Sequence, residues 1–219
     1  MAQHLDLEEQ EQLAEIKHFW NKYGNLITWT LILALGSFAA FNGWQYWQRH
    51  QGLQASALYE EVERAAQAGD AAKVQRAFED VRKDFARTAY AQQAGLVAAT
   101  ALQEGGKPEE ARAALAWVVD KASDEGLRAV ARLRLAALLA EGKSYDEALK
   151  ALEGSFPPAF EGLAADRRAD VLNLQGKKPE ARAEYQKALK ALEPGAEYRR
   201  LVEVKLASLG GEGAGAAKP

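Results

Sequence analysis

The chain has 219 residues with 28 basic and 31 acidic side chains, a formal net charge of −3, and no cysteine. Because the charges nearly balance, no strongly basic surface is available to follow a phosphate backbone, and we do not expect nucleic acid as a partner. The lack of cysteine excludes disulfides, thiolate zinc sites and cysteine nucleophiles. After residue 50, alanine and leucine dominate, β-branched residues are sparse and prolines stand at segment edges, so we expect an all-α fold.

The first predicted element is an amphipathic lead-in over residues 1–22. Apolar side chains recur there at helical spacing while the glutamates take other positions: Leu13, Ile16, Phe19, Trp20 and Tyr23. Such a helix either lies on a membrane or docks a partner, or it simply extends the next element and meets the lipid headgroups with its apolar side. We favour the second interpretation.

A transmembrane helix is predicted over residues 23–48. These 26 residues contain no Asp, Glu, Lys, Arg or His. From Leu26 to Trp44 a helix rises about 28 Å, close to the roughly 30 Å of a bilayer's hydrocarbon core. Aromatic residues flank the apolar run at both ends, where membrane interfaces favour them. The run is too long for a signal-peptide core, so we expect it to remain uncleaved and to anchor the chain in the lipid bilayer.

Two further features of this segment concern packing and orientation. Gly36, Ala40 and Gly43 form a narrow strip of small residues that would allow another helix to approach, although such residues are frequent in spanning helices generally. Lys17 and Lys22 precede the span and only Arg49 follows closely, a weak bias toward a cytoplasmic N-terminus. The domain that follows would then lie outside the cytoplasm.

A repeat domain is predicted over residues 49–209, followed by a disordered tail over residues 210–219. Turn glycines stand at intervals of 37, 36 and 34 residues, each between two helical stretches: Gly69, Gly106, Gly142 and Gly176. Each helix hairpin has a face that it cannot bury alone, so stacked hairpins would share one continuous core and leave an extended concave surface. We expect about four hairpins and a capping helix that begins near Gly195.

The sequence pattern of these segments resembles the tetratricopeptide repeat, in which a glycine turn is followed by an alanine, then a large residue and a small one. The fourth copy fits best, with Gly176, Ala181, Tyr185 and Ala188. The second and first copies fit less faithfully; their matching positions are Gly106, Ala111, Leu115 and Val118, and Gly69, Val74, Phe78 and Val81. The third copy, from Glu141, carries one extra residue.

The repeat phase also predicts which residues line the concave face, on the first helix of each hairpin. In the second hairpin they are Gln93, Leu96, Thr100 and Gln103, and in the fourth Leu163, Asp166, Asp170 and Asn173. This mixed polar and aliphatic lining suits weak binding of polypeptide, because it has few aromatic or arginine anchors. The alternative is that these are ordinary solvated helix positions.

We find no set of residues that would carry catalysis or hold a metal or cofactor. All three histidines lie in the membrane-proximal part, which leaves the repeat domain without the usual general base. Gly142, Lys143 and Ser144 resemble the end of a phosphate-binding loop, but they join two predicted helices instead of a strand and a helix. Asp166 and Asp170 adjoin arginines, which favours a salt-bridged or solvated face. We therefore expect a protein that is not an enzyme.

Nearly the whole chain resembles the YfgM family. The resemblance rests on EEQEQLAEIKHFWNKYGN from Glu8, the single span, GWQYWQRHQ from Gly43, ASALYE from Ala55 and ASDEGLRAVARLRLAALLAEGK from Ala122. It implies a bacterial inner-membrane protein with a periplasmic repeat domain, and an ancillary subunit of the SecYEG translocon. It further implies that the protein chaperones exported polypeptides together with the prolyl isomerase PpiD.

One departure from the family and one alternative function stay open. Many members have Arg-Gly-Asp ahead of the last repeat, where this chain has Arg168, Ala169 and Asp170. Any role that needs the close backbone approach of that glycine is therefore in doubt here. A repeat-domain scaffold for another envelope task, such as cytochrome maturation, would have the same architecture.

Overall fold

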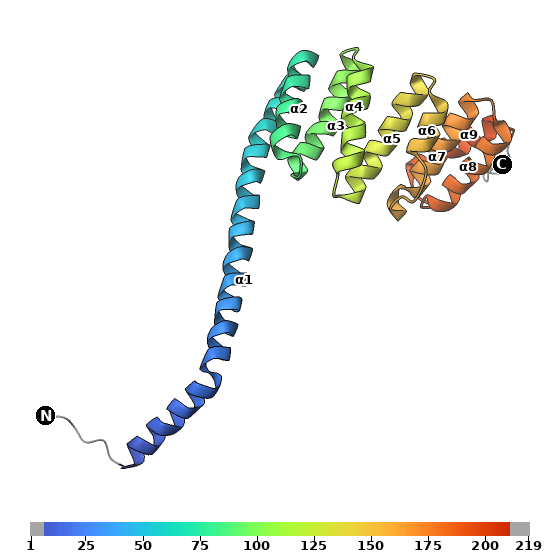
Figure 1. The fold of residues 1–219 in the computed structure, drawn as a ribbon. Helices are drawn as coiled ribbons and strands as arrows, with labels where there is room; N and C mark the ends of the chain where they lie inside the picture. The colour runs from blue at the N-terminus through green and yellow to red at the C-terminus, as the bar shows by residue number, and fades with distance from the viewer. Residues whose placement is uncertain (1–6, 211–219) are drawn as a thin grey trace. The chain divides into compact units, whose positions relative to one another are not determined.

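The computed structural model describes residues 7–210, and all regular structure in that range is helical. The helices are α1 (Leu7–Gln67), α2 (Ala71–Phe85), α3 (Ala89–Glu104), α4 (Pro108–Lys121), α5 (Glu125–Glu141), α6 (Tyr145–Ala151), α7 (Pro158–Leu174), α8 (Lys178–Ala191) and α9 (Glu197–Ser208). Figure 1 shows α2 to α9 following one another as a stack of antiparallel helices. The predicted all-α fold is confirmed. Apart from Gly210, the expected disordered tail lies outside the described residues.

The chain divides between His50 and Gln51 into two compact units, and α1 runs through both. In the first unit, α1 is long and apolar enough to cross a membrane, and its large apolar side chains are exposed. Polar side chains in this stretch bond back to their own helix: the Thr28 hydroxyl donates to the Gly24 carbonyl at 2.7 Å and the Asn42 amide to the Phe38 carbonyl at 2.8 Å. Such local pairing lowers the cost of placing these groups in lipid.

The second unit consists of four helix hairpins and a final helix. The C-terminal part of α1 pairs with α2, α3 with α4, α5 with α6, and α7 with α8, while α9 packs on α8. Each predicted glycine turn therefore separates the two helices of one hairpin, and α9 takes the predicted place of the capping helix. The tetratricopeptide-like arrangement expected from the sequence is confirmed.

Three of the four turns place a glycine in the left-handed backbone region, and the third does not. Gly69, Gly106 and Gly176 have φ of +68°, +73° and +77°. In the third turn Gly142 has φ −76° and ends α5, whereas Lys143 has φ +60°. The third copy is therefore aligned on Lys143 and not on Gly142 as the sequence suggested. This shift accounts for the apparent extra residue.

The core follows the repeat signature. With the third copy realigned, all but one of the signature side chains after the turns are at most 3% exposed: Val74, Phe78, Val81, Ala111, Leu115, Val118, Ala148, Leu152, Ala181, Tyr185 and Ala188. The exception is Ser155 in the third copy, which is exposed and lies beyond the end of the short helix α6. The spacing of the buried residues places them on one face of each second helix. Even the weakly matching first copy therefore buries the expected side chains.

Two glycines inside helices allow the hairpins to pack closely. A Cβ on Gly95 of α3 would lie 2.4 Å from Val118 Cγ2, and a Cβ on Gly162 of α7 would lie 2.7 Å from Leu192 Cγ. Both distances are shorter than any real van der Waals contact of a Cβ atom. The close approach of α3 to α4, and of α7 to the end of α8, thus depends on the missing side chain.

Candidate polypeptide-binding groove

A groove of about 430 Å³ lies on the first helices of the first three hairpins, α1, α3 and α5. The residues that line it are Tyr59, Ala66, Gln93, Leu96, Val97, Thr100, Ala101, Glu104 and Arg134. Three of the four positions predicted in the second hairpin are among them. The fourth, Gln103, lies beside the groove and donates from its amide to a Glu141 carboxylate oxygen at 2.9 Å.

Helix α3 supplies the floor of the groove through its periodicity. Gln93, Leu96, Thr100 and Glu104 are separated by three or four residues and therefore share one face of the helix. Leu96 is half-buried, whereas the other three side chains are exposed. The floor thus combines a partly covered aliphatic side chain with accessible polar groups.

Arg134 of α5 is fastened to this floor. Its Nη1 donates to the Thr100 hydroxyl at 3.2 Å and approaches the Leu96 carbonyl at 3.4 Å. The Thr100 hydroxyl in turn donates to the Leu96 carbonyl at 3.2 Å. These contacts join the exposed guanidinium to α3 and link the second and third hairpins at the groove wall.

One end of the groove is aromatic. The rings of Tyr59 and Tyr90 are 6.0 Å apart between centroids, and the Tyr59 hydroxyl donates to a Glu63 carboxylate oxygen at 2.6 Å. This hydrogen bond, with burial and the nearby negative charge, raises the pKa of Tyr59 to about 12. Tyr59 is therefore a neutral donor at physiological pH, and its ring presents a large apolar surface.

The positions predicted in the fourth hairpin have a different environment. Leu163 is half-buried and Asn173 is exposed, but Asp166 is only 1% exposed and lies beneath α9. Lys205 of α9 contacts an Asp166 carboxylate oxygen and Asp170 Oδ2, both at 2.9 Å. Because α9 covers these carboxylates, they do not face an open groove. The predicted salt-bridged face is formed across two helices.

Two tyrosines complete this polar cluster. The Tyr198 hydroxyl donates to Asp166 at 2.5 Å and the Tyr185 hydroxyl to Asp170 at 2.7 Å. Burial, followed by the hydrogen bond to a carboxylate, raises the pKa of both tyrosines well above the usual value. Each carboxylate thus accepts from Lys205 and from one tyrosine, and the contacts from Lys205 and Tyr198 hold α9 in place.

The predicted small-residue strip in the first unit is accessible in the single chain. A Cβ on Gly36 or Gly43 would meet nothing within 4 Å, and Ala40 is exposed. The strip therefore has no partner within the described chain. Its use in packing against another helix stays a prediction.

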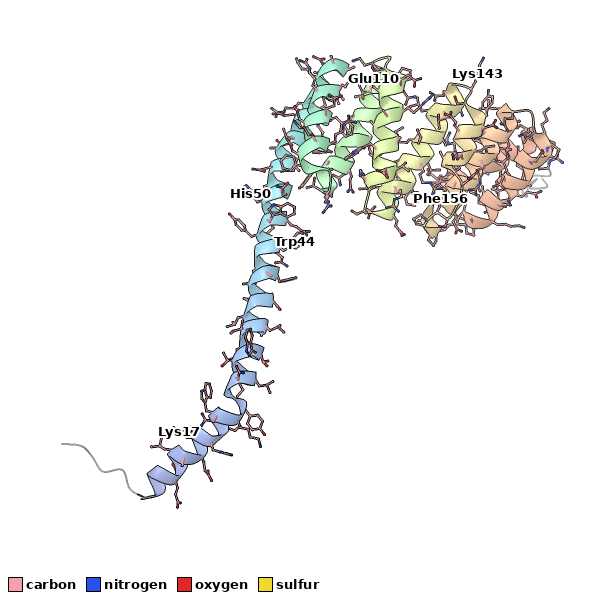
Figure 2. All side chains as sticks on the ribbon, in the orientation of Figure 1. Lys17, Trp44, His50, Glu110, Lys143 and Phe156 are labelled. Atoms are coloured by element: carbon pink, nitrogen blue, oxygen red, sulfur yellow. The ribbon has the colours of Figure 1, made fainter. Side chains whose placement is uncertain are left out.

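Residues considered for chemistry do not converge on a site. Gly142, Lys143 and Ser144 connect α5 to α6, and Figure 2 shows Lys143 at the tip of that turn, away from Phe156 at the other end of the helices. Within residues 7–210, no group of three or more His, Cys, Asp or Glu side chains could hold a metal ion. Among the described residues, the groove lining therefore contains no such group.

Sequence reasoning missed six of the nine groove residues: Tyr59, Ala66, Val97, Ala101, Glu104 and Arg134. The signal for two of them was the 37-residue interval between the first three left-handed turn residues. Shifting Leu96 back by that interval gives Tyr59, and shifting Val97 forward gives Arg134. With Gly142 as the turn residue, the third hairpin is out of phase with the other hairpins by one residue.

Comparison with known proteins agrees with this architecture. A family model described as a tetratricopeptide repeat-like domain matches residues 17–211. A Neisseria gonorrhoeae protein named "Ancillary SecYEG translocon subunit" is 30% identical over 210 residues, which is 95% of this chain and 100% of that protein. Proteins of the same name from Aggregatibacter actinomycetemcomitans and Escherichia coli are 30% and 29% identical, covering 93% and 84% of this chain and 98% and 88% of their own length. The chain therefore belongs to the YfgM family, with a repeat domain of the tetratricopeptide repeat-like type.

Proposed function

We propose that this protein is a membrane-anchored, non-enzymatic subunit that accompanies the SecYEG translocon and chaperones exported polypeptides together with the prolyl isomerase PpiD. The observation that carries the proposal is full-length similarity to proteins named as ancillary SecYEG translocon subunits. The stacked hairpins and their groove supply the surface that a protein-binding role requires.

The proposal includes a location. The single apolar helix α1 anchors the chain in the bacterial inner membrane, with residues 1–22 in the cytoplasm, the span over residues 23–48 and the repeat domain in the periplasm. The lysines before the span support this orientation. Protease added to spheroplasts is expected to digest the repeat domain. Protection of the domain while periplasmic control proteins are cut would contradict the orientation.

The proposal also includes a contact within the membrane. The open strip of Gly36, Ala40 and Gly43 would admit a helix of the translocon, since small residues allow two helix backbones to approach. Gly36→Leu and Gly43→Leu each place a bulky side chain on that strip. If both variants recover SecYEG as well as the wild type does, the contact lies in the repeat domain instead.

The decisive experiment is purification of the tagged full-length chain in a mild detergent, followed by identification of the proteins that accompany it. We expect SecYEG and PpiD at levels well above those recovered with an unrelated single-span protein. Recovery of envelope assembly factors such as those of cytochrome maturation, without SecYEG, would refute the proposal and favour the scaffold alternative.

A further inference from the structure

The groove on α1, α3 and α5 has two chemically different ends. The Tyr59 ring lies at the end of the groove next to the N-terminus of α3, near Tyr90. Glu104 is the last residue of α3 and lies at the opposite end. Gln93 and Glu104, both in the lining, are eleven residues apart, which corresponds to about 16 Å along a helix. The lining therefore extends over a length suited to a short stretch of polypeptide.

The apolar part of the lining lies between these ends. It consists of Ala66, Leu96, Val97 and Ala101. The volume of about 430 Å³ is in the range of small-ligand sites and can hold a few side chains. Large apolar side chains of an extended or helical segment are the groups that would fill it.

The charged groups of the groove occupy different places. Arg134 keeps its positive charge beside the middle of α3, where its Nη1 donates to the Thr100 hydroxyl and the Leu96 carbonyl, and Glu63 lies at the aromatic end, where it accepts from Tyr59. Within residues 7–210, the Glu104 carboxylate makes no ion pair or hydrogen bond. The last turn of α3 contains no basic residue, so the partial negative charge of the helix C-terminus adds to that of Glu104. This end of the groove is therefore complementary to a cation.

We propose that this groove binds polypeptide segments that place large apolar side chains between Tyr59 and Leu96 and a lysine or arginine beside Glu104. The inference rests on the proposed function and names the class of polypeptide that the repeat domain selects. Apolar contact supplies the affinity, and the charge at one end supplies selectivity and direction. Acidic segments of the same apolar content would be disfavoured.

The test uses the full-length chain in nanodiscs of neutral phosphatidylcholine, so that lipid charge does not contribute. Two fluorescent ten-residue peptides share a central leucine and phenylalanine and differ only in ending with two lysines or two glutamates. At low salt we expect the lysine peptide to bind about threefold more tightly, the scale of an exposed ion pair. Raising the salt concentration should reduce this preference, because ions screen exposed charges.

Two variants locate the effect. Glu104→Lys should reverse the preference between the peptides, while Glu79→Lys, a matched change of an exposed glutamate on α2 outside the groove, should leave it unchanged. Equal binding of the two peptides by the wild type, or an unchanged preference in Glu104→Lys, would overturn the inference.

Failure of this inference is distinguishable from failure of the proposed function. If the wild-type chain co-purifies with SecYEG but shows no preference between the peptides, the translocon association stands and the groove chemistry is wrong. If SecYEG is absent from the purified material, the proposed function fails whatever the peptides show.

Discussion

Single residues decide how the turns between hairpins are made. The third turn uses Lys143 at φ +60°, a position where the other turns use glycine. For a residue with a Cβ, the left-handed region costs about 1–2 kcal/mol. The open surroundings of Gly106 and Gly176, where a Cβ would meet nothing within 4 Å, show that the requirement in these turns is conformational and not steric.

Lys143→Gly is therefore expected to stabilise the repeat domain. The gain should be about 0.5–1 kcal/mol, because relief of the strained backbone exceeds the greater chain entropy that glycine adds to the unfolded state. The matched control is Gly106→Ala, which introduces the same strain and should destabilise by about 1 kcal/mol. Urea unfolding of both variants measures the change. A loss of stability in Lys143→Gly would contradict this account of the turn.

The buried tyrosines predict a loss of stability at high pH. In the unfolded chain tyrosine has a pKa of about 10, while burial and Asp166 hold the pKa of Tyr198 well above it. The folded state thus keeps a proton that the unfolded state releases, so the free energy of unfolding should fall as pH rises above about 10.

Urea unfolding between about pH 9 and 11 tests this dependence. Tyr198→Phe should flatten the decline, because phenylalanine has no proton to lose. Tyr145→Phe is a suitable control, since Tyr145 begins α6 and takes no part in the cluster of Asp166 and Asp170. An unfolding free energy that stays constant to pH 11 in the wild type would mean that the cluster does not hold these protons.

Much of the residue-scale core could be predicted from the sequence, because repeat periodicity fixes which side chains face inward. The buried state of Val74, Phe78 and Tyr185 follows from this phase alone. The phase could not distinguish Leu96, which lines a groove, from Asp166, which occupies the corresponding position in the fourth hairpin and lies under α9. That difference depends on the helix that follows the hairpin in the stack. The spacing of residues within one hairpin gives no information about that helix.

At the scale of elements, α9 closes the stack through polar contacts as well as an apolar seam. Val202 and Leu206 of α9 are buried against the fourth hairpin, and Lys205 between them pairs with Asp166 and Asp170. A buried carboxylate that loses its cationic partner is costly, since it has already been removed from water. The cluster therefore determines how firmly the last helix is attached.

Lys205→Met should destabilise the repeat domain by about 3 kcal/mol, because it leaves Asp166 buried without its cation. Lys187→Met provides the control, since Lys187 is exposed and pairs with Glu184, which also contacts Arg168; its loss should cost less than about 1 kcal/mol. Thermal unfolding followed by circular dichroism measures both. Equal effects of the two variants would show that the cluster contributes no more than a surface ion pair.

The order and type of the elements could be predicted because each hairpin repeats the same signals. Glycine turns, alanine-rich helices and prolines at helix starts together predict about four hairpins and a capping helix. Helix α1 continues through Gly52 to Gln67, in keeping with the absence of any turn signal between the span and Gly69. Close packing at Gly95 and Gly162 could not be predicted, because a glycine within a helix indicates no particular partner until the neighbouring helix is placed.

At the scale of the whole molecule, the chain combines one helix able to cross a membrane with a repeat domain that offers a groove. The proposed role as an ancillary subunit makes the groove face the place where exported or partner polypeptides are held. The second helices of the hairpins, which face away from the groove, should not contact these polypeptides.

Site-specific photo-crosslinking in cells tests this claim most directly. A photoreactive residue at Thr100 faces the groove, and one at Ala113, an exposed position on α4, faces outward from the second helix of the same hairpin. We predict that Thr100 captures exported polypeptides and translocon-associated proteins while Ala113 captures few or none. Equal capture from the two positions, or capture from Ala113 alone, would contradict a binding role for the groove.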